Sequence, residues 1–272
     1  MTKIRLSASY NLFNGEELLI PSIRNSHQFC EHISIIFQST SNTGNLADVS
    51  LFEAIKFAID KNLCQDLIWY KPDLGQTARW NERRKREIGL ALAKKNKCSH
   101  YMTLDADEFY FPEEVNRFKV YFSNNLNDYD IVTVPSYLHI KRPCFRSKSH
   151  DTTRAILWSK ITKNLSNKCA ETVPKELKNV DPTRRFADWQ SQVFKIHEIT
   201  DDTCTMYHMN LVRKNGLNSK LNNTSSHRQK LFIEKVRDAY DRWNFPETLD
   251  FPGKPPLQIQ KVKDYFNLEK WI

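Results

Sequence analysis

The stretch Leu104-Asp105-Ala106-Asp107-Glu108-Phe109 is the most informative part of this sequence. It follows a short apolar run, His100-Tyr101-Met102-Thr103, of the kind that forms a buried strand. Charged side chains are seldom buried without a partner, so three acids at the end of a core strand require one. Because open α/β sheets bind ligands at the carboxyl ends of their strands, the stretch predicts a divalent cation there.

The spacing of the first two acids makes them candidate ligands of the same ion. Two carboxylates at i and i+2 point the same way where the chain stays extended, as Asp105 and Asp107 would on leaving a strand. An EF-hand is excluded, because neither a third Asp or Asn nor a glycine follows at the offsets that this loop requires. The alternative is a solvated acidic turn before a helix that begins near Pro112.

Strand and helix patterns alternate around this stretch. Apolar patterns predict strands over 3–9, 32–38, 67–70 and 100–104, and helices from about 16, over 48–62 and over 80–96. Such alternation is typical of an α/β fold, with a mostly parallel twisted sheet that has helices on both faces. Further along, we expect a helix near 113–123, strands at 130–135 and 155–158, an amphipathic helix at about 226–243, and a partly helical C-terminal segment.

Composition narrows the class of protein. The 272 residues include 40% hydrophobic and 27% charged residues, as in a soluble globular protein. The net charge of +9 favours an anionic partner: nucleotide phosphates, nucleic acid or, by peripheral contact, a phospholipid surface. No apolar run is long enough for a transmembrane segment, and no secretory signal is apparent. Six cysteines without a CxxC pair indicate free thiols, and we expect a cytoplasmic location.

The basic run before the acids falls on a predicted helix. Ile88 and Leu92 mark the buried side of the helix over 80–96. Counting back by three or four residues from Ile88 gives Arg84 and Lys85, and then Asn81. We therefore expect basic groups on the sheet-facing side of this helix at its N-terminal end, beside the acids.

Four segments together support a resemblance to a known family. The first two are Asn81-Glu82-x-x-Lys85-Arg86-x-x-Gly89-Leu90-x-x-Ala93 and Tyr101-x-x-Leu104-Asp105-Ala106-Asp107-Glu108-Phe109-Tyr110. The others are Ser9-Tyr10-Asn11 with Glu16-Glu17, and Tyr207-His208-Met209-Asn210-Leu211-Val212-Arg213-Lys214-Asn215 with Lys220. With these segments the chain resembles nucleotide-sugar-dependent glycosyltransferases of the GT-A fold, in the branch close to glycosyltransferase family 2. The resemblance covers about residues 3–225.

The resemblance implies a fold and an activity. The fold would be a GT-A type, Rossmann-like catalytic domain over 1–225, with the nucleotide-sugar half at 1–110, the acceptor half at 111–225, and a C-terminal helical extension over 226–272. The activity would be metal-dependent transfer of a hexose or pentose from a nucleotide-sugar donor, with a UDP-sugar favoured, to a hydroxyl acceptor such as a glycan.

The resemblance also assigns roles to residues. Asp105 and Asp107 would hold Mn²⁺ or Mg²⁺ on the donor diphosphate, with His208 as a further ligand, and Lys214 or Lys220 would neutralise the leaving nucleotide. The residues expected to bind the nucleotide sugar are Tyr10, Asn11, Glu16, Ser39, Asn81, Lys85, Arg86, Asp105, Lys214 and Lys220. Asp188, beside Trp189, is the expected catalytic base for the acceptor hydroxyl. A core position for His208 and a helix cap for Asp188 are the alternatives.

Other functions are compatible with parts of the sequence. Two acids at a sheet edge also serve metal-dependent nucleotidyl or phosphoryl transfer, although no GxxxxGK loop is present. The charge and the aromatic residues Trp69, Tyr70 and Trp80 suit a non-enzymatic nucleic-acid-binding protein, but no RNP, zinc-finger or helix-turn-helix signature supports it. A glycosyltransferase acting on hydroxymethylated bases of viral DNA would combine both properties, and salt-sensitive DNA binding would distinguish it.

Overall fold

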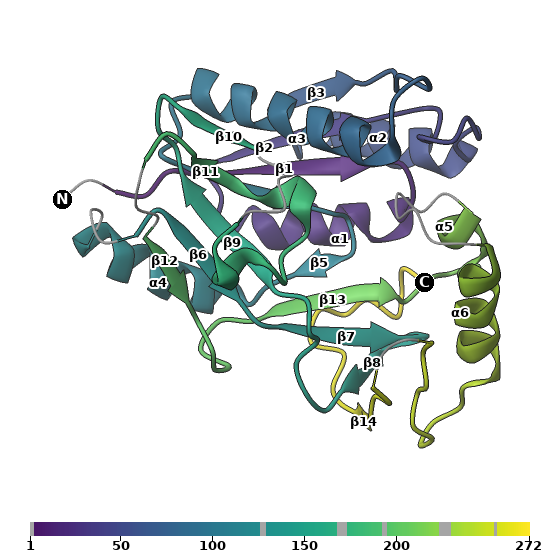
Figure 1. Cartoon of the computed structure of the whole chain (residues 1–272). Coiled ribbons are helices and arrows are strands. Elements are labelled where there is room, and N and C mark those ends of the chain that lie inside the picture. Colours follow the sequence, from purple (N-terminus) through teal and green to yellow (C-terminus); the bar gives the residue numbers. More distant parts are fainter. Residues whose placement is uncertain (1–2, 126–128, 168–172, 192–194, 223–229, 253–254) are drawn as a thin grey trace.

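The structure is a computed structural model that describes residues 3–125, 129–167, 173–191, 195–222, 230–252 and 255–272. Within these ranges a seven-stranded sheet and a five-stranded sheet form the body of the molecule, with helices around them (Figure 1). The order of the elements along the chain confirms the α/β class predicted from the sequence.

The seven-stranded sheet has the order β12-β6-β9-β4-β1-β2-β3. Its strands are β1 (Leu6–Leu12), β2 (His32–Phe37), β3 (Asp66–Trp69), β4 (His100–Leu104), β6 (Ile131–Val134), β9 (Ala155–Lys160) and β12 (Ile196–Glu198). Strands β1 to β4 are parallel, and β9 runs antiparallel to β4 and β6. The chain moves outward from β1 to β3 and returns on the other side of β1, so the strand order reverses between β1 and β4. Such a reversal point is where α/β sheets bind ligands.

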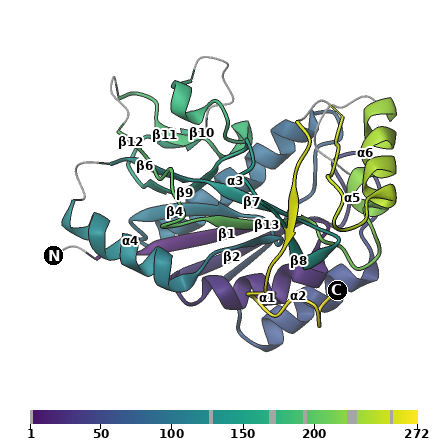
Figure 2. The ribbon, with the colours of Figure 1, turned by 90° about the horizontal axis from the view of Figure 1, so that it is seen from below.

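Helices cover both faces of this sheet (Figure 2). α1 (Glu16–Ser26) and α2 (Val49–Asp60) lie on one face, and α3 (Ala78–Lys95) lies on the other. Successive strand residues point to opposite faces, so Tyr10 packs toward α1 while Ser9 and Asn11 face α3. α3 approaches closely at Gly89, where a Cβ would lie 2.0 Å from the Ser9 hydroxyl oxygen. A larger residue would push the helix away from the sheet.

The five-stranded sheet was not expected from the sequence. Its order is β14-β8-β7-β13-β5, formed by β5 (Glu108–Phe109), β7 (Ser136–Ile140), β8 (Arg142–Ser147), β13 (Met206–Leu211) and β14 (Ile259–Lys261). β5 follows the acidic stretch directly, and β13 pairs with it antiparallel, with His208 opposite Glu108. This pairing brings a histidine from a distant part of the chain beside the acids.

The remaining described elements are short or lie at the periphery. They are α4 (Pro112–Asn124), β10 (Leu165–Asn167), the 3₁₀ helices η1 (Lys175–Leu177) and η2 (Pro182–Arg184), β11 (Phe186–Asp188), α5 (Asn218–Asn222) and α6 (Lys230–Arg242). β10 and β11 form a separate two-stranded sheet. α6 confirms the helix expected at 226–243 from Lys230 onward, while 226–229 and the proposed domain boundary at 225 lie outside the described residues.

The two ends of the chain differ in detail from the expected pattern. The first strand was predicted over 3–9 but runs from Leu6 to Leu12, so Tyr10 and Asn11 lie within it. The region 226–272, where the resemblance implies a helical extension, contains α6 and also β14, which pairs with β8 and completes the second sheet. Proline-rich segments such as the one before β14 suit extended backbone better than helix.

Two properties relate to cellular environment. In the ranges that the structure describes, no helix combines the length and the apolar character that crossing a bilayer requires. Five of the six cysteines lie in these ranges, and all five are free thiols: Cys30, Cys64, Cys98, Cys144 and Cys204.

Candidate functional site

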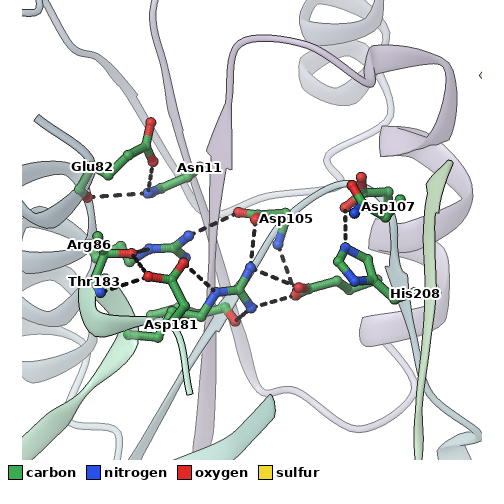
Figure 3. Close-up of polar contacts among 12 residues, drawn as sticks. Asn11, Glu82, Arg86, Asp105, Asp107, Asp181, Thr183 and His208 are labelled. Carbon is green, nitrogen blue, oxygen red and sulfur yellow. Dashed lines mark hydrogen bonds and ion pairs between the residues drawn. The ribbon is translucent and has the colours of Figure 1, made fainter. Parts of the chain in front are cut away.

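The acidic stretch forms a turn between the two sheets. β4 ends at Leu104, and the Glu108 N–H donates to the Asp105 carbonyl over 3.2 Å before β5 begins. The chain is therefore not extended here, and the expectation that both carboxylates point the same way is wrong. Asp105 faces α3, whereas Asp107 faces β13 and His208 (Figure 3). The two acids contact different sets of cations.

Asp105 lies between two arginines. Arg86 Nη2 is 3.2 Å from one carboxylate oxygen, and Arg184 Nη2 is 2.5 Å from the other. Arg184 also lies 2.7 Å from Glu108 Oε1, so one guanidinium binds two carboxylates. Both arginine side chains are buried. Desolvation would raise the pKa of Asp105, but Arg184 and Arg86 lower it to about 2.

Asp107 is buried, and only one of its two carboxylate oxygens accepts hydrogen bonds. Arg213 Nη2 and Lys220 Nζ lie 2.5 and 2.9 Å from the same oxygen, Oδ2. The other oxygen, Oδ1, is buried without a hydrogen-bond partner, and His208 Nε2 is 3.6 Å from it. Burial would raise the pKa of Asp107, but Lys220 and Arg213 hold it well below its usual range. An unpaired buried carboxylate oxygen needs a partner, because leaving it unsatisfied destabilises the fold.

Two of the three expected metal ligands fit a cation in this arrangement. A carboxylate oxygen and an imidazole nitrogen are ordinary ligand atoms for divalent ions, and Asp107 Oδ1, which has no hydrogen bond, lies 3.6 Å from His208 Nε2. Asp105 has both oxygens bound by arginines. Consistent with this, no three His, Cys, Asp or Glu side chains of the described ranges are grouped so that they could share an ion. The remaining ligands would have to come from substrate or water.

A polar network lies on the α3 side of the sheet, at the edge formed by the carboxyl ends of β1, β2 and β4. Glu82 accepts hydrogen bonds from Asn11 Nδ2 at 3.2 Å, from Asn42 Nδ2 at 2.9 Å and from Lys85 Nζ at 2.8 Å. Burial would raise the pKa of Glu82, but Lys85 and a neighbouring arginine lower it. The amide oxygens of Asn11 and Gln38 are buried and have no partner. This side of the edge therefore offers acceptors to a ligand that carries N–H or O–H groups.

The buried side of α3 differs by about one position from the predicted one. Lys85 is buried as expected, but Arg84 is exposed and pairs with Glu87 at 2.6 Å, and Arg86 is buried instead. The helix is oriented by Gly89, which lies against the sheet. Asn81 is fully buried and holds the preceding loop, because its side-chain oxygen accepts from the Tyr70 hydroxyl and from the Asp73 N–H.

Two further predicted residues do not face the acids. The Tyr10 hydroxyl bonds with Ser22 and Ser26 of α1, and burial raises its pKa. Tyr10 and Asn11 are neighbours in one strand and so cannot both face α3. Ser39 accepts a hydrogen bond from Trp69 Nε1 over 3.1 Å near the outer edge of the sheet.

Asp188, in β11 of the two-stranded sheet, lies near the amino end of β4, whereas the acids follow the carboxyl end of that strand. Its carboxylate accepts from the Thr162 hydroxyl over 2.9 Å and from a backbone N–H two residues ahead. Thr162 follows Ile161, whose N–H bonds to the Ser99 carbonyl at the amino end of β4. The acids lie at the carboxyl end of the same strand, about 13 Å further along at 3.3 Å per residue. The structure therefore does not bring the predicted base to the acids.

Two cationic residues that contact the acids were not predicted from the sequence. Arg184 comes from η2, and Arg213 follows β13, and neither lies in a pattern that marks a buried position. The sequence predicted that Lys214, the residue after Arg213, would neutralise the leaving nucleotide. In the structure Lys214 is exposed, whereas the Arg213 side chain is only 7% exposed. Lys220 does reach Asp107, and Glu16 and Lys214 line a neighbouring cavity.

Cationic and acidic side chains are equal in number in this cluster. Four cationic side chains, Arg86, Arg184, Arg213 and Lys220, contact the four carboxylates of Asp105, Asp107, Glu108 and Asp181. They sit at the point where the strand order reverses. This arrangement suits an anionic ligand that exchanges partners with the carboxylates.

No protein-family model matches the sequence, and no curated protein matches it. Among solved structures, TarS 1–349 of S. aureus in complex with UDP matches at 9% identity and a TM-score of 0.37, over 51% of this chain and 37% of that one. The mannosyltransferase PcManGT of Pyrobaculum calidifontis, in complex with GDP-Man and Mn²⁺, matches at 13% identity and a TM-score of 0.36, over 53% and 37%. The chain thus spans little more than a third of these structures, and TM-scores this low establish no shared chemistry.

Proposed function

We propose that this protein is a nucleotide-sugar-dependent glycosyltransferase of the GT-A type that uses a divalent cation. The observation that carries the proposal is the state of Asp107. One of its oxygens is neutralised by Arg213 and Lys220, and the other is buried without a hydrogen bond, 3.6 Å from His208 Nε2. A cation bound to a diphosphate satisfies the free oxygen and brings negative charge for the basic groups. The sequence resemblance and the reversal point between β1 and β4 support the same assignment.

The reaction requires stabilisation of a leaving diphosphate. The bond between the anomeric carbon and the diphosphate oxygen breaks, its electron pair stays on the diphosphate, and a new bond forms to the acceptor oxygen. The proton of the acceptor hydroxyl passes to a base. Arg213 and Lys220, which contact Asp107, would neutralise the charge that develops on the diphosphate. A Mn²⁺ or Mg²⁺ ion held by Asp107 and His208 would act as a Lewis acid on the same group.

The nucleoside would lie on the α3 side of the edge. Asn11 and Gln38 present unpaired amide oxygens there, and Glu82 adds a carboxylate. These acceptors suit the N–H edge of a base and the hydroxyls of a ribose. Arg86, on the same side, contacts Asp105 and so would lie between the nucleoside and the diphosphate. Nucleoside and diphosphate would thus follow the edge from α3 toward His208.

A donor-hydrolysis assay tests the proposal. The protein is incubated with UDP-, GDP-, CMP- and ADP-sugars in the presence of Mn²⁺ or of a chelator, and release of the nucleoside diphosphate or monophosphate is measured. We expect release from one of these donors, with Mn²⁺ only. Absence of release from every donor at high enzyme concentration would contradict the proposed function.

A further inference from the structure

Among the described residues, two buried amide oxygens on the α3 side of the sheet accept no hydrogen bond. They are Oδ1 of Asn11, near the end of β1, and Oε1 of Gln38, the residue after β2. Asn11 is 8% exposed and Gln38 is 1% exposed. Asn11 lies opposite Ile36, and the Gln38 N–H extends the same ladder by donating to the Leu12 carbonyl over 3.1 Å. Because side chains alternate along a strand, both amides face α3 from adjacent strands.

The orientation of these amides is fixed by one carboxylate. Glu82 of α3 pairs with Lys85 at 2.8 Å, so it accepts hydrogen bonds and does not donate. Asn11 Nδ2 donates to Glu82 Oε2 over 3.2 Å (Figure 3), and Asn42 Nδ2 donates to Oε1 over 2.9 Å. The Asn42 oxygen then accepts from Gln38 Nε2 at 3.3 Å. Each amide thus uses its NH₂ group within the network, and the oxygens of Asn11 and Gln38 remain available to a ligand.

Tyr70 adds an aromatic ring to the same cluster. Its N–H donates to the Phe37 carbonyl over 2.7 Å and extends the pairing of β2 with β3, which places Tyr70 beside Gln38. Its hydroxyl donates to Asn81 of α3 over 2.6 Å. Tyr70 and Asn42 are partly exposed, so the cluster reaches the surface of the protein. A ring beside hydrogen-bonding groups suits a planar base, which stacks on one and pairs with the other.

The pattern of acceptors discriminates among the bases. Guanine presents two neighbouring donors on one edge, N1–H and the N2 amino group. Uracil presents one N–H between two carbonyl oxygens, and cytosine and adenine each present one amino group beside an accepting ring nitrogen. Two carbonyl oxygens on adjacent strands therefore match guanine. The other bases would bring an acceptor against one of the two oxygens and leave it unpaired, which weakens binding.

We propose that this cluster selects a guanine nucleotide, so that the donor is a GDP-sugar and Asn11 and Gln38 determine the base. The inference rests on the proposed function and names the nucleotide of the donor, in place of the UDP-sugar that the sequence resemblance favours. The two amide oxygens accept from the guanine edge, and Tyr70 stacks on the face of the ring. The diphosphate then extends past Arg86 toward Asp107.

Nucleotide affinities test this inference without a sugar or an acceptor. Calorimetry with Mn²⁺ measures the binding of GDP, UDP, ADP, CDP and inosine diphosphate to the full chain. Inosine diphosphate differs from GDP only in lacking the N2 amino group, so it removes one donor and alters no protein group. Gln38→Met removes the amide at similar side-chain length. Gln28→Met, at an exposed position after α1, is the matched control.

We expect GDP to bind the wild type at least about tenfold more tightly than each of the other four nucleotides. In Gln38→Met the ratio of GDP to UDP affinity should fall about tenfold, whereas Gln28→Met should keep the wild-type ratio. The comparison of GDP with inosine diphosphate holds whether or not the variant folds.

Three results would overturn the guanine assignment and leave the proposed function standing. They are UDP binding as tight as GDP binding, equal binding of GDP and inosine diphosphate, and an unchanged ratio in a Gln38→Met protein that circular dichroism shows to be folded. Absence of binding by every nucleotide would overturn the proposed function, and the guanine assignment with it.

Discussion

Two carboxylates that follow strands, Asp107 after β4 and Asp188 at the end of β11, have opposite surroundings. Asp107 is buried, and cations from the segment after β13 and from α5 converge on it. Asp188 is partly exposed and binds a hydroxyl and a backbone N–H nearby. From the sequence, Asp107 was expected to be a metal ligand and Asp188, beside Trp189, to be the catalytic base. Of the two acids, Asp107 is the one on which charged groups from distant parts of the chain converge.

The largest effect is expected from Asp107→Asn. Turnover with the donor should fall by about a hundredfold or more, because the variant loses the charge that would hold a cation on the diphosphate. The exchange also leaves Arg213 and Lys220 without their counter-ion, so we expect a loss of stability of about 3 kcal/mol. Turnover is measured at a temperature where circular dichroism shows the variant folded. Turnover equal to that of the wild type would remove Asp107 from the mechanism.

The second-largest effect is expected from replacing Arg184, which binds the carboxylates of both Asp105 and Glu108. Arg184→Met leaves Asp105 and Glu108 without their shared partner and should lower the free energy of unfolding by about 3 kcal/mol, measured in urea. Arg142→Met removes an exposed ion pair with Glu269 and should cost no more than about 1 kcal/mol. Equal losses in the two variants would show that burial of the Arg184 network is not the cause.

A smaller effect is expected in acid. The pKa of Asp105 is about 2 in the folded protein, below its unfolded value of about 3.9. Its ion pairs therefore stabilise the fold fully above pH 4, and this contribution is lost as the pH falls toward 2. Asp105→Asn should flatten the decrease of the melting temperature between pH 4 and pH 2, measured by thermal unfolding. A variant with the same pH dependence as the wild type would contradict the ion-pair explanation.

The smallest effect is expected from Asp188→Asn. Loss of its charge should leave donor turnover within about twofold, because the side chain lies at the amino end of β4, away from the acids. Stability should fall by about 1 kcal/mol through the weakened bonds to Thr162 and the following backbone. A large fall in turnover without unfolding would instead identify Asp188 as the base.

Much of the first half of the fold could be predicted from the sequence. The strands at 32–38 and 100–104 and the helices at 48–62 and 80–96 appear within a few residues of their expected bounds. Each is specified by the spacing of apolar residues within a few turns or pleats, which is a local property. The second sheet was not predicted, because β5, β7 and β13 are short strands whose pairing depends on residues far apart in the chain.

The candidate site, like the fold, was predicted only where local sequence patterns specify it. The sequence located the acids at the end of a buried strand, and it placed Lys85 on the inner side of α3, because these features follow from strand and helix periodicity. Arg86 is buried where Arg84 was expected. It also selected Tyr10, whose neighbour Asn11 faces the other side of the sheet. Alternation along a strand could have excluded one of them, had the strand been predicted to extend beyond residue 9.

The sequence by itself determined that carboxylates end the fourth strand of an α/β sheet, beside a basic helix. The tertiary structure alone decided that the chain turns between Asp105 and Asp107, and which cations meet each of them. Arg184 is 79 residues from Asp105, and Arg213 is 106 residues from Asp107. No local pattern encodes such partners, because ion pairs over these distances form only after both sheets have assembled.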